Sequence, residues 1–556
     1  MKKFINENTL AVFVFSITCF VSFVYGELYF YSTSGMDYGK YKSFVSYFQG
    51  ISETTGHGQG VIYYYLIAFI SELRVSLLNN LNSGSFNSSN IQILNMFLYL
   101  FGLRGFYLIL CRYQFSRNII LYCFSFLNFF PATFEMRILM KPEIAAFALL
   151  PWLLLVTDDL FEKFDYKKLV FASVIASLIF TLKGSIFGMI GAFLLIKYAK
   201  KIYIDKRRIV IFVTIFISVF SFLYVENFNI NQIHLLDHNT EDYEAYQNKA
   251  SVNFIYHLNE WDFYYFPIRD YHSNSLIGIT LFDTFGDYFD LTYNNDSTYL
   301  AYEREVYFTD GLTKTFSRQY LALILSLVFY FLLAFYYIRE KRFRLYLFSP
   351  LIGIAILLIN AFGFPNLNFD PLTGDTFKVH YYSFFLTISF IFLTSILLSK
   401  NKLLAYVVLI FFSLSSVYIV GFPKNDTNNI DFYLSSKNSI SPFCNITNFT
   451  FDDGDKSNCN KPENMCLFNP NAELVNKEIL SKKIENDFNL NPVILINDTN
   501  LIYETSSPQE CFDLVKNGSD FDYGKKIDLK FPPLVNLAYF LIVLFAVPIY
   551  LKEKNE

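Results

Sequence analysis

Long apolar stretches, separated by short polar turns, run along most of the chain. A helix needs about 20 apolar residues to cross the hydrocarbon core of a bilayer. The pattern therefore predicts a mainly α-helical, polytopic membrane protein. About twelve stretches are expected to span the membrane, namely 10–30, 91–111, 118–134, 143–157, 169–182, 184–198, 209–225, 319–338, 345–362, 381–398, 403–420 and 534–551.

Basic residues between these stretches predict the direction of each span, because cytoplasmic loops carry an excess of lysine and arginine. The spans alternate consistently when every basic turn is placed inside, that is 112–117, 163–168, 197–208, 339–344, 400–402 and 552–556. Residues 61–78 are apolar but do not fit this alternation, and Glu72 and Arg74 interrupt them. We expect 61–78 to form an amphipathic helix on the extracytoplasmic surface.

The same alternation divides the chain into five parts. Hydrophobicity falls at Pro423 and returns at Leu534, which predicts a small extracytoplasmic α/β or mixed domain between them. The expected parts are an N-terminal transmembrane module (1–225) with a first outer loop (31–90), a long extracytoplasmic loop (226–318), further transmembrane helices (319–420), an extracytoplasmic domain (421–533), and a transmembrane helix with a cytoplasmic tail (534–556).

The composition supports this reading. Hydrophobic residues make up 53% of the 556 residues and charged residues only 17%, whereas an ordinary soluble domain carries about 25% charge. This excludes a soluble enzyme, and the lipid bilayer is an expected partner. The net charge of −4 gives no indication of nucleic-acid binding.

Four of the seven cysteines fall in the 421–533 domain. An even number of cysteines in an extracytoplasmic module predicts two disulfides, with three pairings open. The alternative is a zinc site, which the spacing does not favour because it lacks CxxC and a nearby histidine. The cysteines are Cys444, Cys459, Cys466 and Cys511.

The first outer loop carries two candidate features. Asp37 lies just beyond the first span, where a carboxylate could act as a general base on an acceptor hydroxyl; the alternative is a solvated loop aspartate. The run Gly56–Gly60, GHGQG, lets the backbone pass close to a ligand. His57 and Gln59 within it could bind phosphate or sugar hydroxyls, or the run could be a flexible hinge.

Cations gather at outer ends of the predicted spans. Arg137, Lys141 and Glu143 lie in the run EMRILMKPE (135–143), and Lys183 lies in a second outer turn. Cations at a membrane boundary suit a lipid phosphate. The alternative is a set of snorkelling side chains with an Arg–Glu pair.

Lys378 and His380 occupy a third position of this kind, at the entrance of the 381–398 span. A lipid phosphate again suits this site, and an ordinary interfacial anchor is the alternative.

The 226–318 loop is acidic and aromatic. In DTFGDYFD (283–290), Asp283 and Asp287 alternate with rings, as expected of a carbohydrate-binding surface. His234 and His238 have the i, i+4 spacing of metal ligands, although a third ligand at fixed spacing is lacking.

Together these features resemble the glycosyltransferase C superfamily, which includes protein O-mannosyltransferases and the lipid A aminoarabinose transferase. The resemblance covers the layout of residues 1–420, and its motifs are MDYGKY (36–41), RILMKPE (137–143) and DTFGDYF (283–289). It implies transfer of a sugar from a polyprenyl-phosphate donor to a glycan, lipid or protein acceptor, by an inverting single displacement.

The resemblance also implies roles for individual residues. Asp37 would be the base, and His57, Gln59, Glu143, Asp283 and Asp287 would contact substrate. The donor phosphate would be held by Arg137, Lys141, Lys183, Lys378 and His380, with Lys141 and Lys378 ranked first. The cofactor is left open: these cations could replace a metal, and a divalent cation is the alternative.

Two alternatives remain. One is an envelope polysaccharide polymerase or ligase, and the other is a lipid or glycan transporter. The expected location is the cell (inner) membrane with the site facing the periplasm or exterior, or the endoplasmic reticulum membrane in a eukaryote.

Overall fold

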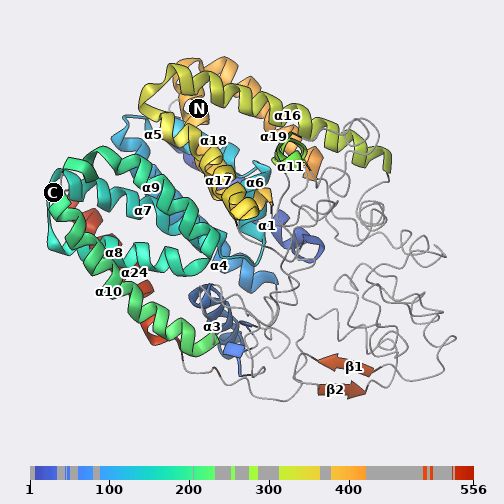
Figure 1. Cartoon of the computed structure of the whole chain (residues 1–556). Helices are drawn as coiled ribbons and strands as arrows, with labels where there is room; N and C mark the ends of the chain where they lie inside the picture. Colours follow the sequence, from blue (N-terminus) through green and yellow to red (C-terminus); the bar gives the residue numbers. More distant parts are fainter. Residues whose placement is uncertain are drawn as a thin grey trace.

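The computed structural model is a bundle of helices (Figure 1). It describes residues 7–33, 44–50 apart from 46, 60–78, 88–231 apart from 205, 252–256, 275–285, 312–363, 377–420, 493–496, 501–504, 529 and 532–555. The elements of the first half are α1 (Glu7–Thr33), α3 (Val61–Leu78), α4 (Ser88–Arg112), α5 (Arg117–Leu127), α6 (Pro131–Ile138), α7 (Glu143–Glu162), α8 (Tyr166–Leu182), α9 (Gly184–Ile204) and α10 (Lys206–Asn231).

The elements of the second half include five further long helices and one pair of short strands. They are α11 (Asn253–Tyr256), α14 (Leu276–Asp283), α16 (Leu312–Arg339), η4 (Lys341–Phe343), α17 (Arg344–Gly363), η5 (Val379–Tyr382), α18 (Ser383–Lys400), α19 (Lys402–Val420), β1 (Val493–Ile496), β2 (Leu501–Glu504) and α24 (Leu534–Asn555).

Nine helices in the described residues are long and apolar enough to cross a membrane, and a tenth is counted if the bent pair α5–α6 is one span. This supports a multi-pass membrane protein, but the predicted twelve spans are not confirmed. Helices α8 and α9 do form at the predicted spans 169–182 and 184–198, but neither is counted among these candidates. Helix α8 has only 17 residues, and lysines in its second half reduce the hydropathy of α9.

The predicted span 118–134 corresponds to a bent pair of helices, because this segment breaks into α5 and α6 with an angle of 71° between them. Pro131 occupies the start of α6, where a residue without an N–H is tolerated. Asn128 at the break accepts a hydrogen bond from the hydroxyl of Tyr99 at 2.9 Å. The bend turns α6 away from the path of a simple span.

Helices α7 and α18 form the centre of the bundle. In their apolar parts, 83% and 89% of the residues are buried inside the protein. By contrast, only 6% of the residues in the apolar part of α10, and 17% of those in α1, are buried inside the protein. Exposed apolar side chains on a helix suit lipid tails, so α1 and α10 lie where the bilayer is expected. In Figure 1, α4, α7, α8, α10 and α24 form one side of the bundle, and α16 to α19 with α5 form the other.

Helix α3 coincides with the predicted helix 61–78. Its apolar part, Val61–Leu73, is shorter than the helices that could span a membrane. The helix itself is confirmed, and its place on the extracytoplasmic surface stays a prediction. Within the 421–533 domain, the described residues form one antiparallel hairpin of β1 and β2, with Val493 opposite Glu504. The predicted α/β domain is therefore not confirmed.

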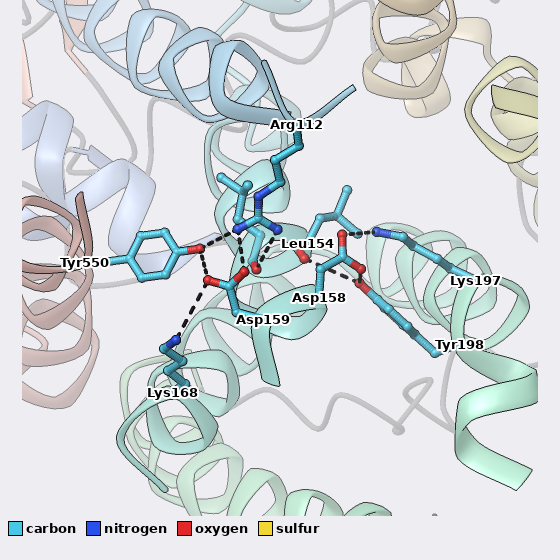
Figure 2. A network of polar contacts seen from close by, with 9 residues as sticks. Arg112, Leu154, Asp158, Asp159, Lys168, Lys197, Tyr198 and Tyr550 are labelled. Carbon is cyan, nitrogen blue, oxygen red and sulfur yellow. Dashed lines mark hydrogen bonds and ion pairs between the residues drawn. The ribbon is translucent and has the colours of Figure 1, made fainter. Parts of the chain in front are cut away.

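Several helix ends that were predicted to face the cytoplasm meet in one polar network (Figure 2). Arg112 of α4 pairs with Asp159 of α7 at 2.6 Å and donates to the hydroxyl of Tyr550 of α24 at 2.8 Å. Tyr550 in turn donates to Asp159 at 2.5 Å. Beside them, Lys197 of α9 pairs with Asp158 at 2.8 Å.

We call this set the inner network; its members are Arg112, Asp158, Asp159, Lys168, Lys197, Tyr198 and Tyr550. It joins the C-terminal ends of α4, α7 and α24 to the N-terminal end of α8. This grouping agrees with the alternation predicted from the basic turns.

The opposite end of α24 is also fixed by hydrogen bonds. The carboxylate of Glu226, near the end of α10, accepts from the backbone N–H groups of Val535 and Asn536 at 2.7 Å each. It also accepts from the side chain of Asn536 at 2.6 Å. A carboxylate here satisfies amides that lack intrahelical partners and complements the helix dipole.

We expect Tyr550→Phe to lower the free energy of unfolding by about 2 kcal/mol, because the hydroxyl binds two charged groups. Thermal unfolding in detergent micelles measures the change. The matched control is Tyr539→Phe on the same helix, because the Tyr539 hydroxyl makes no hydrogen bond in the described part of the chain. Equal losses in the two variants would contradict a stabilising role for the network.

Candidate functional site

Three connections between helices bring polar side chains to one end of the bundle. They are residues 139–142 between α6 and α7, Lys183 between α8 and α9, and residues 377–382, which lead into α18. Because η5 in the third connection packs against α6, α9 and α14, the three are neighbours. We call the polar side chains there the outer cluster; its members are Glu135, Lys141, Glu143, Lys183, Lys378, His380 and Tyr381.

Two buried side chains of α4 fix the connection between α6 and α7. The amide of Asn95 donates to the carbonyls of Arg137 and Leu139 at 2.7 and 2.9 Å. The amide of Gln92 donates to the carbonyl of Ile138 at 2.9 Å. Carbonyls at a helix end have no intrahelical partner, so these amides allow α6 to stop here and Lys141 to follow in a fixed position.

The start of α3 rests against the same connection. The Tyr63 hydroxyl donates to Asn95 at 2.8 Å. Burial raises the pKa of Tyr63, so its hydroxyl stays protonated and keeps its donor role. Gly60 has a positive φ of 63°, and a Cβ there would lie 3.1 Å from the ring of Pro142. A larger residue at Gly60 would therefore disturb the contact between the first outer loop and the outer cluster.

An ion pair joins the second connection to α7. The Lys183 ammonium lies 2.7 Å from the Glu143 carboxylate and 3.9 Å from the centre of the Tyr381 ring. The two paired side chains are only 11% and 3% exposed. A cation over an aromatic face is stabilised by the ring quadrupole, so Tyr381 helps to hold Lys183 at the centre of the cluster.

His380 lies between the side chains of Lys141 and Glu135. Its Nε2 is 3.1 Å from the Nζ of Lys141, and its Nδ1 is 3.9 Å from a carboxylate oxygen of Glu135. Glu135 is buried, and the His380 side chain is 15% exposed. Lys378, which is 8% exposed, lies 6.0 Å from the Tyr381 ring centre.

The outer cluster therefore contains three lysines and two glutamates, and it carries a net positive charge even when His380 is neutral. Charge-assisted hydrogen bonds from lysine to phosphate or carboxylate oxygens are about twice as strong as neutral ones. A partly buried cluster with this excess of cations can bind a small anionic group.

The structure brings five of the predicted site residues together, as Lys141, Glu143, Lys183, Lys378 and His380. Glu143 begins α7, as predicted from the sequence. Their separation along the chain is large, so their proximity is a property of the fold.

Arg137 is placed differently. Its guanidinium donates to the carbonyl of Ser22 and, at 2.9 Å, to the hydroxyl of the same residue in α1. It also lies 5.1 Å from the Phe134 ring centre, and its side chain is among the largest fully buried ones. These contacts link α6 to α1, so Arg137 has a packing role distinct from the one expected of a phosphate ligand.

Asp283 ends α14, is 3% exposed, and belongs to a helix that packs against η5 and α16. It is thus near the outer cluster, although it belongs to a different segment. The other candidates lie outside the described residues: Asp37, His57, Gln59, Asp287, His234, His238 and the four cysteines of the 421–533 domain. Within the described residues there is no group of potential metal ligands, and Cys19, Cys111 and Cys123 are free thiols.

Four participants were missed from the sequence, namely Tyr63, Gln92, Asn95 and Tyr381. Tyr381 directly follows His380, so an aromatic residue beside a predicted cation was the available signal. Tyr63, Gln92 and Asn95 lie in apolar helices, where one polar group among hydrophobic ones gives no sign of its partner.

No family model matches the chain, and no curated protein or solved structure matches it either.

We expect Glu143→Gln to lower the free energy of unfolding by about 3 kcal/mol, because it leaves the ammonium of Lys183 without its carboxylate in a buried site. The double variant Glu143→Gln/Lys183→Met should lose less than the single variant, since both charges are gone. Denaturant unfolding of four proteins, namely the wild type, Glu143→Gln, Lys183→Met and the double variant, measures this coupling. Losses that simply add would contradict it.

Proposed function

We propose that this chain is a multi-pass membrane glycosyltransferase that moves a sugar from a polyprenyl-phosphate donor to an acceptor on the extracytoplasmic side. The observation that carries the proposal is the outer cluster, in which Lys141, Lys183, Lys378 and His380 converge from three separate connections. This arrangement suits one phosphate group at the end of a helical bundle.

The chemistry of the leaving group supports this assignment. When the sugar leaves a polyprenyl phosphate, negative charge develops on the phosphate oxygens. Fixed donors directed at that charge are worth most in a site with little water. Lys183 is already held by Glu143 and Tyr381, so it would orient the cluster, while Lys141 and Lys378 would contact the phosphate. A resident metal is not needed for this role.

The apolar surface of the bundle supports a lipid-linked donor. Helices α1 and α10 expose large apolar residues, such as Phe20 at 69% and Phe222 at 64%. An isoprenoid tail could lie among lipid chains along such helices while its phosphate reaches the outer cluster. A water-soluble nucleotide sugar would gain nothing from this surface.

The acceptor side of the reaction rests on the first outer loop. Asp37 would take the proton of the acceptor hydroxyl, and the phosphate would leave from the opposite face of the sugar, which inverts the anomeric centre. The neighbourhood of Gly60 and Pro142 supports this division, because a Cβ at Gly60 would lie 3.1 Å from the Pro142 ring, so the residue that precedes α3 lies beside the connection from α6 to α7. Asp283 and Asp287 would contact sugar hydroxyls.

We expect Asp37→Asn to abolish sugar transfer without changing the amount of folded protein in membranes. Mass spectrometry of envelope glycans, glycolipids and glycoproteins would compare cells with the wild type, with no copy of the gene, and with the variant. The control is Asp165→Asn at the start of α8, because asparagine caps a helix as well as aspartate does. A sugar lost without the gene but restored by Asp37→Asn would refute the assignment of the base.

We expect Lys141→Met to lower kcat/KM for a polyprenyl-phosphate sugar by about 100-fold or more, the usual loss for one donor to a developing negative charge. The matched control is Lys163→Met, an exposed lysine at the far end of α7. Transfer rates in reconstituted vesicles measure both. Equal activity of the two variants would exclude the outer cluster as the donor-phosphate site.

A further inference from the structure

The contacts of His380 define which of its nitrogens carries a proton. A lysine ammonium has only donors, so its 3.1 Å contact with Nε2 requires that nitrogen to accept. A neutral imidazole then carries its proton on Nδ1, which is the nitrogen that faces Glu135 at 3.9 Å. The three side chains thus form a row in which the charge of Glu135 favours a proton on the Nδ1 that faces it, and Nε2 accepts from Lys141.

We propose that His380 is a proton-linked ligand of the outer cluster: it is neutral when the site is empty and takes up one proton when a tetrahedral dianion binds. This rests on the proposed function, because the natural dianion would be the phosphate released from the donor. On binding, the Lys141 ammonium turns from Nε2 to an oxygen of the anion. Nε2 then takes up a proton from the bulk solvent and donates to the anion as well; one N–H bond forms, one O–H bond of a hydronium ion breaks, and no other bond changes.

The charges around His380 give the reason. Without an anion, a second positive charge would lie 3.1 Å from Lys141, with Lys183 and Lys378 grouped around the adjacent Tyr381. In the described part of the chain, the carboxylate of Glu135 faces the imidazole at 3.9 Å as a counter-charge. A bound dianion adds two negative charges and changes this balance in favour of the imidazolium.

Further charges on the elements packed against η5 do not alter this argument. From α7, Glu143 is already paired with Lys183. From α14, Asp283 is buried at the end of that helix. Helices α17 and α18 carry Arg344 and Lys400 at their ends away from η5. The group that can change its charge near neutral pH is therefore the imidazole.

The test uses sulfate, because it remains a dianion throughout the range in which histidine titrates. Binding of radiolabelled sulfate to the full chain in lipid nanodiscs would be measured between pH 5 and 9. For the wild type, we expect the affinity to fall with rising pH by up to about tenfold per pH unit, as one linked proton requires. His380→Gln should bind more weakly at low pH and show no such slope.

A matched control separates His380 from other histidines. His257→Gln removes a histidine with no assigned role, and it should keep the slope of the wild type. Lys141→Met should weaken binding at every pH. Proton uptake by the wild type in weakly buffered solution gives a second measurement that needs no variant, and about one proton per bound sulfate is expected near the midpoint of the slope.

The outcomes distinguish this inference from the proposed function. A slope that persists in His380→Gln, or sulfate binding without proton uptake, would overturn the role of His380 and leave the anion site intact. Saturable binding that Lys141→Met does not change would place the anion elsewhere and refute both. Absence of saturable sulfate binding in the wild type would also refute both.

Discussion

Hydrogen bonds from two amide side chains of α4 hold the end of α6, and the outer cluster depends on them. A backbone carbonyl without a partner costs several kcal/mol at membrane depth, so a helix can break there only where the protein itself supplies donors. Asn95 and Gln92 supply them to three successive carbonyls. Because α6 can end in this way, Lys141 follows in a defined place and α7 can begin at Glu143.

Helix α7 connects the two charged regions of the bundle. It starts with Glu143 in the outer cluster and approaches its end with Asp158 and Asp159 in the inner network. Its middle is apolar and buried. Charges are costly inside a bilayer, and here they are confined to the helix ends. The lysines of the outer cluster likewise lie at helix ends, and the interior of the bundle is apolar and packed.

Sequence patterns predicted the local features well. Helix 61–78, the start of α7 at Glu143 and the spans 10–30 and 534–551 all correspond to helices of the structure, because apolar length and an acidic first turn are local signals. The lysines of the outer cluster were found for the same reason, since charges at the ends of apolar stretches stand out.

Features that depend on tertiary contacts could not be predicted. The break in 118–134 is held by contacts with other helices, such as the hydrogen bond from the Ser22 hydroxyl to the Asn128 carbonyl at 3.3 Å, and a count of apolar residues does not reveal them. Arg137 looked like its neighbour Lys141 in sequence, yet one side chain turns to α1 and the other to His380. Arg137 lies within α6 whereas Lys141 follows its end, so the two side chains meet different parts of the fold. The packing of α24 against α8 and α10 could not be predicted from the sequence for the same reason.

The placement of α24 has a consequence for the order in which the protein is made. Its partners at both ends, Glu226 and Arg112, precede it by hundreds of residues. During synthesis, α4, α7, α8 and α10 enter the membrane long before α24 emerges from the ribosome. Until then, the charged ends of α4 and α7 and the carboxylate of α10 lack these contacts. Assembly of this side of the bundle is therefore completed only after translation has passed residue 550, which couples maturation of the N-terminal helices to completion of the C-terminal part of the chain.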